Sequence, residues 1–435
     1  MQPVELHKMN SDYSKTTKAT QNEGGSTANQ KVLKLVYTII FAVLIYLDYY
    51  NHDSFMDFSV SLITQMQISL GPVYGKIGYF ISYGVIFLPA FYLIYRVIHP
   101  RCYAENQYYI QLIVLAVVAT LILKAAYGRG RPEFVGQNVI AYDCCCDYGM
   151  PSGHSSFALT GFHILAFALA FGVSSREKSL GTGLLQLACY VGAILVGWSR
   201  LQLGAHALNQ VVYGFLLSGF VILIWTWRVF KRTLKLLSLG KTSLAVGSLF
   251  WLATIFAYFW LVKKDIESEP SPRWKYWTKC PNCSGTFKYE QITTTTAITG
   301  LGTLVLGYAI NFKISRSDRH KLNERSAGLF FKRLGAVLIV LLFTGVISLG
   351  VSALFVGQVP DNLYGKAYLK AILLFVALNI LCAMLSGGLA WVFASLGLAV
   401  EADFYREDED GLGYDGTSTS KDRFNRLDVT DGSYR

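Results

Sequence analysis

The repeated apolar runs of about 20 residues constrain this chain more than any other feature, because runs of that length cross a bilayer as α-helices. Charged residues make up 15% of the 435-residue chain and hydrophobic residues 53%, whereas a soluble globular domain carries roughly 25% charged residues. The sequence therefore predicts an all-α, polytopic membrane bundle. About ten spans are expected: 35–50, 77–98, 108–123, 155–173, 180–198, 207–225, 242–262, 293–311, 334–355 and 368–392.

The segment between the first two spans carries an apolar stripe with no Lys or Arg. Its members, Phe55, Phe58, Leu62, Met66 and Leu70, recur at helical spacing. Such a stripe is typical of a helix that lies on the membrane surface, and a re-entrant or fully inserted segment is the alternative.

The distribution of Lys and Arg predicts how the spans are oriented. A net charge of +11 is compatible with nucleic-acid binding, but these charges fall in short loops, where they orient spans instead of lining a groove. The positive-inside rule assigns the cation-rich side to the cytosol, and an even number of spans then places both termini there. That side holds the N-terminal tail and the loops at 96–101, 176–178, 228–241 and 313–333. The mixed-charge loop 263–290 departs from this pattern.

Five of the eight cysteines fall on the opposite, oxidising side of the membrane in this topology. They are Cys144, Cys145, Cys146, Cys280 and Cys283. At least one disulfide among them is expected, and half of a zinc site is the alternative for the CxxC pair. The sequon at Asn282 is a candidate for glycosylation.

Three separated stretches contain the polar groups that indicate chemistry. The first begins with Lys124 at the end of the third span and reaches Arg131. Gly128, Gly130 and Pro132 break the helix between and after them, so both cations can turn toward one site at the membrane surface. The alternative is that these cations, with the neighbouring arginine, only extend to the lipid–water interface.

The second stretch is Pro151-Ser152-Gly153-His154, where a loop gives way to an apolar run. Proline suits the first turn of a helix, and the free backbone N–H groups of a helix start bind anions. Gly153 lets an oxyanion approach the backbone, and His154 can give or take a proton beside it. A plain helix cap is the alternative.

The third stretch joins spans five and six and contains Arg200, His206 and Gln210. All three stretches lie on the same face of the predicted membrane bundle. One lysine, two arginines and a helix N-terminus suit a dianionic phosphoryl group, and two histidines add a nucleophile and an acid. Alternatively, Arg200 only marks topology and His206 is a satisfied histidine at a span end. His163, in the middle of span four, is assigned to structure.

The spacing of these residues resembles the type-2 phosphatidic acid phosphatase superfamily, which includes membrane lipid phosphatases and glucose-6-phosphatases. The pattern is Lys, six residues, Arg-Pro; then Pro-Ser-Gly-His; then Ser-Arg, five residues, His, three residues and Asp. The match covers residues 124–210, with Gln210 where the superfamily usually has Asp. Gln at this place is similar to the glucose-6-phosphatase and dolichyl-diphosphatase branches, and the run 199–214 looks most like the glucose-6-phosphatase version.

The resemblance implies a mechanism in which His206 attacks phosphorus and forms a phosphohistidine, while His154 protonates the leaving alcohol. Gln210 would orient the ring of His206. Metal-independent hydrolysis without a cofactor is expected. The phosphate-binding groups would be Lys124, Arg131, Arg200, Ser152 and Gly153.

The predicted function is removal of phosphate from a sugar phosphate similar to glucose 6-phosphate, on the lumenal side of the endoplasmic reticulum. A lipid phosphate or polyprenyl diphosphate phosphatase is the first alternative, and a non-catalytic anion-binding membrane protein is the second. The expected organisation is a disordered tail (1–32), an additional span (33–53), a glucose-6-phosphatase-like domain (54–400, with its core at 107–228) and an acidic disordered tail (401–435). Membrane lipids are expected partners, and nucleic acid is not.

Overall fold

The computed structural model describes residues 28–98, 103–144, 148–172, 180–226, 229–230 and 331–339, with isolated positions between 245 and 398. By their contacts, residues 37–402 form one unit, and 1–36 with 403–435 form another. The last four predicted spans and both tails lie almost wholly outside the described residues. The helical bundle belongs to the unit 37–402.

The described part of the chain is helical and contains no strand, which confirms the all-α prediction. The number of about ten spans is not confirmed. Two helical stretches are long and apolar enough to cross a membrane, Lys31–Tyr95 and Leu180–Gln202, and shorter apolar helices run over Tyr108–Lys124 and Leu208–Ile224. The elements are α2 (Ala28–Phe80), the π-helical turn η1 (Ile81–Val85), α3 (Phe87–Ile98), α4 (Tyr103–Tyr127), α5 (Pro132–Val135), α6 (Gly153–Gly172), α7 (Leu180–Gln202) and α8 (Leu208–Ile224).

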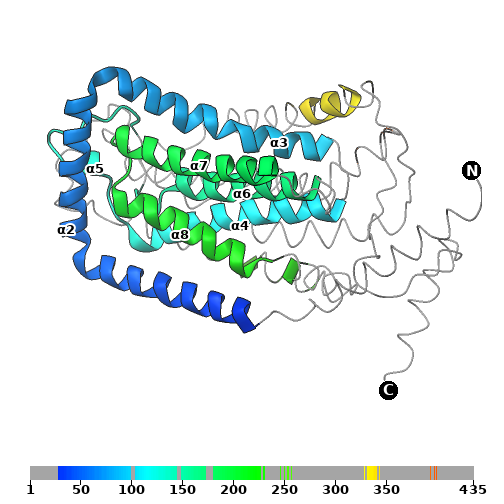
Figure 1. The fold of residues 1–435 in the computed structure, drawn as a ribbon, viewed down its shortest axis with the longest axis horizontal. Helices are drawn as coiled ribbons and strands as arrows, with labels where there is room; N and C mark the ends of the chain where they lie inside the picture. Colours follow the sequence, from blue (N-terminus) through cyan, green and yellow to red (C-terminus); the bar gives the residue numbers. More distant parts are fainter. Residues whose placement is uncertain are drawn as a thin grey trace, which may run out of the picture. The chain divides into compact units, whose positions relative to one another are not determined.

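Two kinks divide α2, at Asn51 (φ −112°, ψ 17°) and at Gly71 (φ 70°, ψ 178°). The positive φ at Gly71 is one that residues with a Cβ rarely adopt, and Pro72 then suits the first turn of a new helical segment. The middle part of α2, residues 52–70, therefore runs across the end of the bundle, while residues 37–50 and the part after Gly71 run along the bundle (Figure 1).

The middle part of α2 packs one face against the bundle, and the predicted apolar stripe is split between its two faces. Met66 is buried with Ile63 against Leu201, whereas Phe55 and Phe58 are 41% and 58% exposed. The helix crosses the end of the bundle (Figure 1), and its position on a membrane surface stays a prediction. The stripe does not predict which face of this helix is buried, because apolar residues lie on both its packed face and its exposed face.

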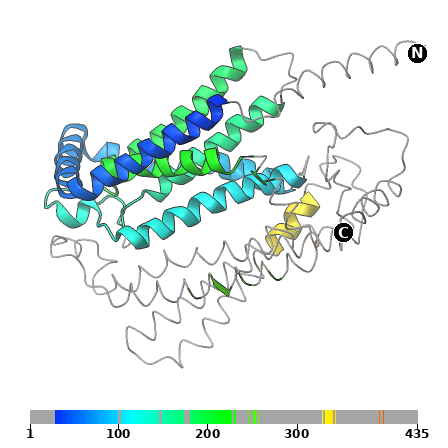
Figure 2. The same ribbon diagram turned by 90° about the horizontal axis from the view of Figure 1, so that it is seen from below.

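Helix α6 is the centre of the bundle and contacts α3, α4, α7 and α8. Helices α4, α6, α7 and α8 run alongside one another in both views (Figures 1 and 2). Most of the buried side chains along the contact between α6 and α7 are small, so the two helices can approach closely. Its buried members are Ala158, Phe162, Ala166, Cys189, Ala193 and Val196.

The loops at one end of this bundle are bonded to each other through their backbones. Tyr142 N–H donates to Leu203 O (3.2 Å), and Ser152 N–H donates to Gln210 O (2.9 Å). The first bond ties the loop after α5 to the α7–α8 connection, and the second ties the start of α6 to the first turn of α8. This end of the bundle, crossed by the middle of α2, holds all three stretches that the sequence analysis singled out.

Candidate active site

His206 lies in the short connection between α7 and α8 and is 1% exposed. Its Nδ1 lies 2.8 Å from Gly149 O and 3.2 Å from Gln210 Oε1, both acceptors. Nδ1 therefore carries the proton. Nε2 then carries a lone pair, which fits its contact of 3.2 Å with Arg131 Nη1, because a guanidinium only donates. Burial, followed by Arg131 and the other nearby cations, lowers the pKa of His206 well below its ordinary value, so the ring is neutral.

Gln210, in the first turn of α8, links three parts of the site through one buried amide. Its Oε1 accepts from Ala207 N–H (3.1 Å) and faces His206 Nδ1, while its Nε2 donates to Gly130 O (2.7 Å). The contact that an orienting role requires is thus present. As a neutral group, Gln210 stabilises a histidinium less than a carboxylate would.

Arg200, near the C-terminus of α7, is fully buried. Its Nη1 donates to Ser82 Oγ (2.9 Å) and to Asp143 Oδ2 (2.7 Å). Its Nε and Nη2 have no hydrogen-bond partner among the residues that the structure describes. Leaving buried charged donors unpaired is costly, and these two donors form the edge of the guanidinium that binds an oxyanion in a bidentate manner.

The two other predicted phosphate-binding cations lie in the same cluster. Lys124, in the last turn of α4, is 4% exposed, and Arg131, just before α5, is 2% exposed. Arg131 Nη1 also donates to Ala205 O (2.6 Å). Both cations lie close enough to His154 and His206 to lower the pKa of each imidazole. The fold therefore brings the three stretches together.

The start of α6 differs from the expectation for Pro151 and Ser152. The helix begins at Gly153, so Pro151 precedes the cap instead of occupying the first turn. Ser152 is the cap: its Oγ accepts from Ser155 N–H (3.4 Å) and Ser155 Oγ (3.0 Å), and its own N–H is donated to Gln210 O. Ser152 therefore has no free amide for phosphate, whereas the first two N–H groups of α6, at Gly153 and His154, have no acceptor in the described part of the chain.

His154 is half-buried at the first turn of α6, just before the apolar run begins. Its ring packs edge-to-face against Tyr83, with the centroids 5.2 Å apart and the planes at 86°. Burial and the charge of Arg200 lower the pKa of His154 to about 3, while the nearby Asp143 carboxylate acts in the opposite direction. The imidazole of His154 is therefore neutral near pH 7.

Ser82, Tyr83 and Asp143 belong to the site but were not among the predicted residues. Tyr83 Oη donates to Asp143 Oδ2 (2.8 Å). Burial raises the pKa of Asp143, but the Arg200 charge and the Tyr83 hydrogen bond outweigh burial and lower it, so Asp143 is ionised. Two signals could have found these residues. Ser82 and Tyr83 are polar side chains within an apolar run, and Asp143 is an acid in the loop between two of the stretches that carry the candidate site.

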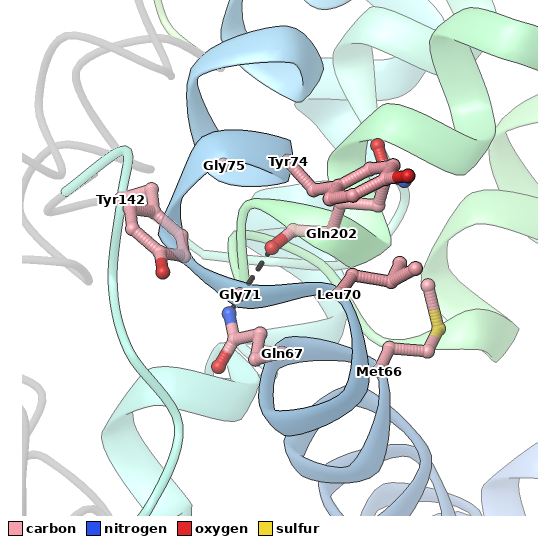
Figure 3. A pocket seen from close by; sticks show the side chains of 8 residues that line it. All are labelled: Met66, Gln67, Leu70, Gly71, Tyr74, Gly75, Tyr142 and Gln202. Carbon is pink, nitrogen blue, oxygen red and sulfur yellow. Dashed lines mark hydrogen bonds between the residues drawn. The ribbon is translucent and has the colours of Figure 1, made fainter.

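A small pocket opens beside the site at the Gly71 kink (Figure 3). Its volume is about 10 Å³, the room that one water molecule needs, and far below the roughly 300–1,000 Å³ of a typical ligand pocket. Within its lining, Gln67 Nε2 donates a hydrogen bond to Gln202 O (3.1 Å). The lining residues are Met66, Gln67, Leu70, Gly71, Tyr74, Gly75, Tyr142 and Gln202.

The remaining predicted residues have simpler outcomes. His163 Nδ1 lies 2.9 Å from Tyr190 Oη and links α6 to α7, as expected of a structural histidine. Cys144 is disulfide-bonded, while Cys145, Cys146, Cys280, Cys283 and Asn282 lie outside the described residues. No group of three His, Cys, Asp or Glu side chains gathers as metal ligands within the described ranges, and metal-independent hydrolysis stays a prediction.

Comparison with known proteins finds similarity in the central part of the chain. Residues 107–234 match the model of the PAP2 superfamily. The chain is similar to lipid phosphate phosphatase gamma of Arabidopsis thaliana, with 26% identity over 168 residues that cover 37% of this chain and 64% of that protein. A PAP2 type phosphatidylglycerolphosphate phosphatase from Bacillus subtilis is similar in structure, with 18% identity and a TM-score of 0.37 over 46% of this chain and 96% of that chain. The PAP2 resemblance is confirmed, and the glucose-6-phosphatase branch is not shown.

Proposed function

From the PAP2 superfamily domain at residues 107–234, we propose that the chain is a membrane phosphohydrolase that cleaves a phosphate ester through a phosphohistidine at His206. The arrangement of His206 supports this most directly. Its proton is held on Nδ1 by Gly149 O, so that Nε2 carries the lone pair of a nucleophile. Arg131 lies beside that atom, and the unpaired edge of Arg200 belongs to the same cationic cluster.

The proposed reaction has two displacement steps at phosphorus. In the first, His206 Nε2 forms a bond to phosphorus as the ester P–O bond breaks, and the leaving oxygen takes a proton from His154. Arg131, Arg200 and Lys124 stabilise the charge on the phosphoryl oxygens. In the second step, His154 accepts a proton from water, whose oxygen bonds to phosphorus as the P–N bond breaks.

Protonation of His154 is coupled to substrate binding in this scheme. Burial and the Arg200 charge lower the pKa of this imidazole and keep it neutral. A bound phosphate dianion adds negative charge beside it and favours the imidazolium. The acid is therefore formed only when its substrate is present.

The substrate class is proposed on separate grounds. The relative in Arabidopsis thaliana is a lipid phosphate phosphatase, which favours a lipid phosphate as the substrate of this chain. The glucose-6-phosphatase-like run that includes Gln210 favours a sugar phosphate as the second candidate. A panel of short-chain phosphatidate, a polyprenyl diphosphate and glucose 6-phosphate, assayed with purified protein, decides between them by kcat/KM.

The nucleophile is tested by trapping the phosphoenzyme. Protein incubated briefly with ³²P-labelled substrate and denatured in neutral detergent should retain label that acid releases. The label should disappear in His206→Ala and persist in His163→Ala, because His163 contacts Tyr190 away from the cationic cluster. Acid-labile label that persists in His206→Ala would remove this residue from the role.

The site is further proposed to face the lumen. The resemblance to glucose-6-phosphatases favours the endoplasmic reticulum as the organelle. In sealed vesicles with the cytosolic side outward, a membrane-impermeant substrate should be hydrolysed only after the vesicles are opened with detergent. Full activity before opening would refute a lumenal site.

A further inference from the structure

The two histidines of the site are held in different ways. His206 is fixed by Gly149 O, Gln210 Oε1 and Arg131 Nη1. The imidazole of His154 has no hydrogen-bond partner within the part of the chain that the structure describes, and its ring contact is with Tyr83. A general acid must be oriented within hydrogen-bonding reach of the oxygen that it protonates, so the residue that orients His154 matters for catalysis.

Tyr83 is itself firmly anchored. Its Oη donates to Asp143 Oδ2 (2.8 Å), and the same carboxylate oxygen accepts from Arg200 Nη1 (2.7 Å). The guanidinium carbon of Arg200 lies 5.9 Å from the centroid of the Tyr83 ring. The tyrosine ring is thus held between a phosphate-binding candidate and the imidazole, and cannot rotate away without breaking its bond to Asp143.

The π-helical turn η1 explains why this segment reaches the site. Single π-helical turns often occur at functional sites because they change the direction of side chains within a helix. Here two consecutive residues of η1 both contact the site: Ser82 Oγ accepts from Arg200, and Tyr83 packs against His154. Both residues lie outside the PAP2 match at 107–234.

We propose that Tyr83, anchored by Asp143, is a positioning residue that holds the His154 imidazole in the orientation from which it protonates the leaving oxygen. The inference rests on the proposed function. An edge-to-face pair fixes the plane of one ring relative to the other. In the first step, the His154 N–H bond breaks as the leaving oxygen gains that proton, and the orientation of the imidazole plane sets the direction of the transfer.

This role predicts that the effect of a Tyr83 substitution depends on the leaving group. An alkoxide is a poor leaving group and needs the proton of His154, whereas p-nitrophenolate leaves without one. A residue that only supported the fold or phosphate binding would affect both substrates equally. The ratio of the two kcat/KM values therefore separates the effect on proton transfer from effects on folding and on phosphate binding.

The experiment compares an alkyl phosphate that the wild type hydrolyses with p-nitrophenyl phosphate. For Tyr83→Leu, kcat/KM on the alkyl phosphate should fall by about 10–100-fold. On p-nitrophenyl phosphate kcat/KM should stay within about threefold, because it reports formation of the phosphoenzyme and not the later step in which His154 accepts a proton from water. Tyr83→Phe, which keeps the ring but not the bond to Asp143, should show the same selectivity with a smaller loss. Tyr79→Leu is the matched control: Tyr79 contacts Tyr83 in a tilted arrangement, with centroids 4.6 Å apart, but is 50% exposed, and both substrates should react as in the wild type.

A pH profile of Asp143→Asn provides a second measurement. Burial, Arg200, Lys124 and Arg131 lower the pKa of His154, and the Asp143 carboxylate is the group that raises it. Removing the carboxylate should therefore move the alkaline limb of kcat/KM for the alkyl phosphate to lower pH, because the acid form is lost earlier. The p-nitrophenyl phosphate profile should keep its alkaline limb.

The outcomes separate the two proposals. Equal losses on both substrates in the Tyr83 variants, or no loss on either, would overturn the positioning role while leaving the proposed function intact. A wild type that hydrolyses neither substrate nor any member of the panel would overturn the proposed function, and the positioning role with it.

Discussion

Replacing Arg200 by lysine tests whether its unpaired edge binds phosphate. The guanidinium uses Nη1 for Ser82 and Asp143 and keeps Nε and Nη2 for a ligand. A lysine can keep the ion pair with Asp143, but its single ammonium cannot also present two donors in one plane. A charge-assisted hydrogen bond contributes about 1.5–3 kcal/mol. Losing one of the two should therefore lower kcat/KM about 10–150-fold, since about 1.4 kcal/mol corresponds to tenfold.

The alanine variant extends the same series. Arg200→Ala removes both donors and takes from Asp143 its ion pair, while the Tyr83 hydrogen bond remains. The loss of transition-state stabilisation becomes about 3–6 kcal/mol, which lowers kcat/KM by about 10²–10⁴-fold. Thermal unfolding of each variant, measured in the same detergent, separates this loss from a loss of folded protein.

Arg129→Lys is the matched control, because Arg129 lies in the neighbouring loop and is partly exposed. Its kcat/KM should stay within about threefold of wild type, as is usual for a surface substitution. If Arg200→Lys matched Arg129→Lys at unchanged thermal stability, the buried guanidinium edge would not be a phosphate site.

Two further substitutions test the local structure around the site. Gln210→Leu should lower the free energy of unfolding by about 2–6 kcal/mol, because Gly130 O and the amide at the start of α8 lose their partner at about 1–3 kcal/mol each; an unchanged denaturation midpoint would contradict the observed bonding. Gly204→Ala places a Cβ 2.7 Å from Ile140 O at a φ of +70°, a conformation that costs an L-residue about 1–2 kcal/mol before any overlap, so its melting temperature should fall. Gly183→Ala meets no atom within 4 Å, and a drop equal to that of Gly204→Ala would show that the effect does not come from the backbone conformation.

The helices were predictable because hydropathy follows burial in the bilayer, but their ends were not. The apolar run 180–198 corresponds to α7, which continues to Gln202 because backbone hydrogen bonding persists after the hydropathy falls at Ser199. At the start of α6, proline is compatible both with the first turn and with the loop before a serine cap. Sequence alone did not distinguish the two for Pro151.

The site was predictable only where the residues recur at fixed spacing. Lys124, Arg131 and His206 belong to such patterns, and the fold brings them together. Tyr83 and Asp143 do not: they lie 60 residues apart, in a π-helical turn and an irregular loop. Neither element has a hydropathy period, so their convergence follows from tertiary packing alone.

Gln67 gives the middle of α2 a consequence for the timing of local opening. Its side-chain amide pairs with both backbone groups of Ile140, since Oε1 accepts from the N–H and Nε2 donates to the carbonyl, each at 2.9 Å. One side chain thus satisfies the two backbone groups of Ile140, as a paired β-strand would do. The Ile140 amide can exchange with deuterium only when its bond to Gln67 breaks. Its exchange rate therefore reports how often the middle of α2 separates from this loop at the end of the bundle that holds the candidate site.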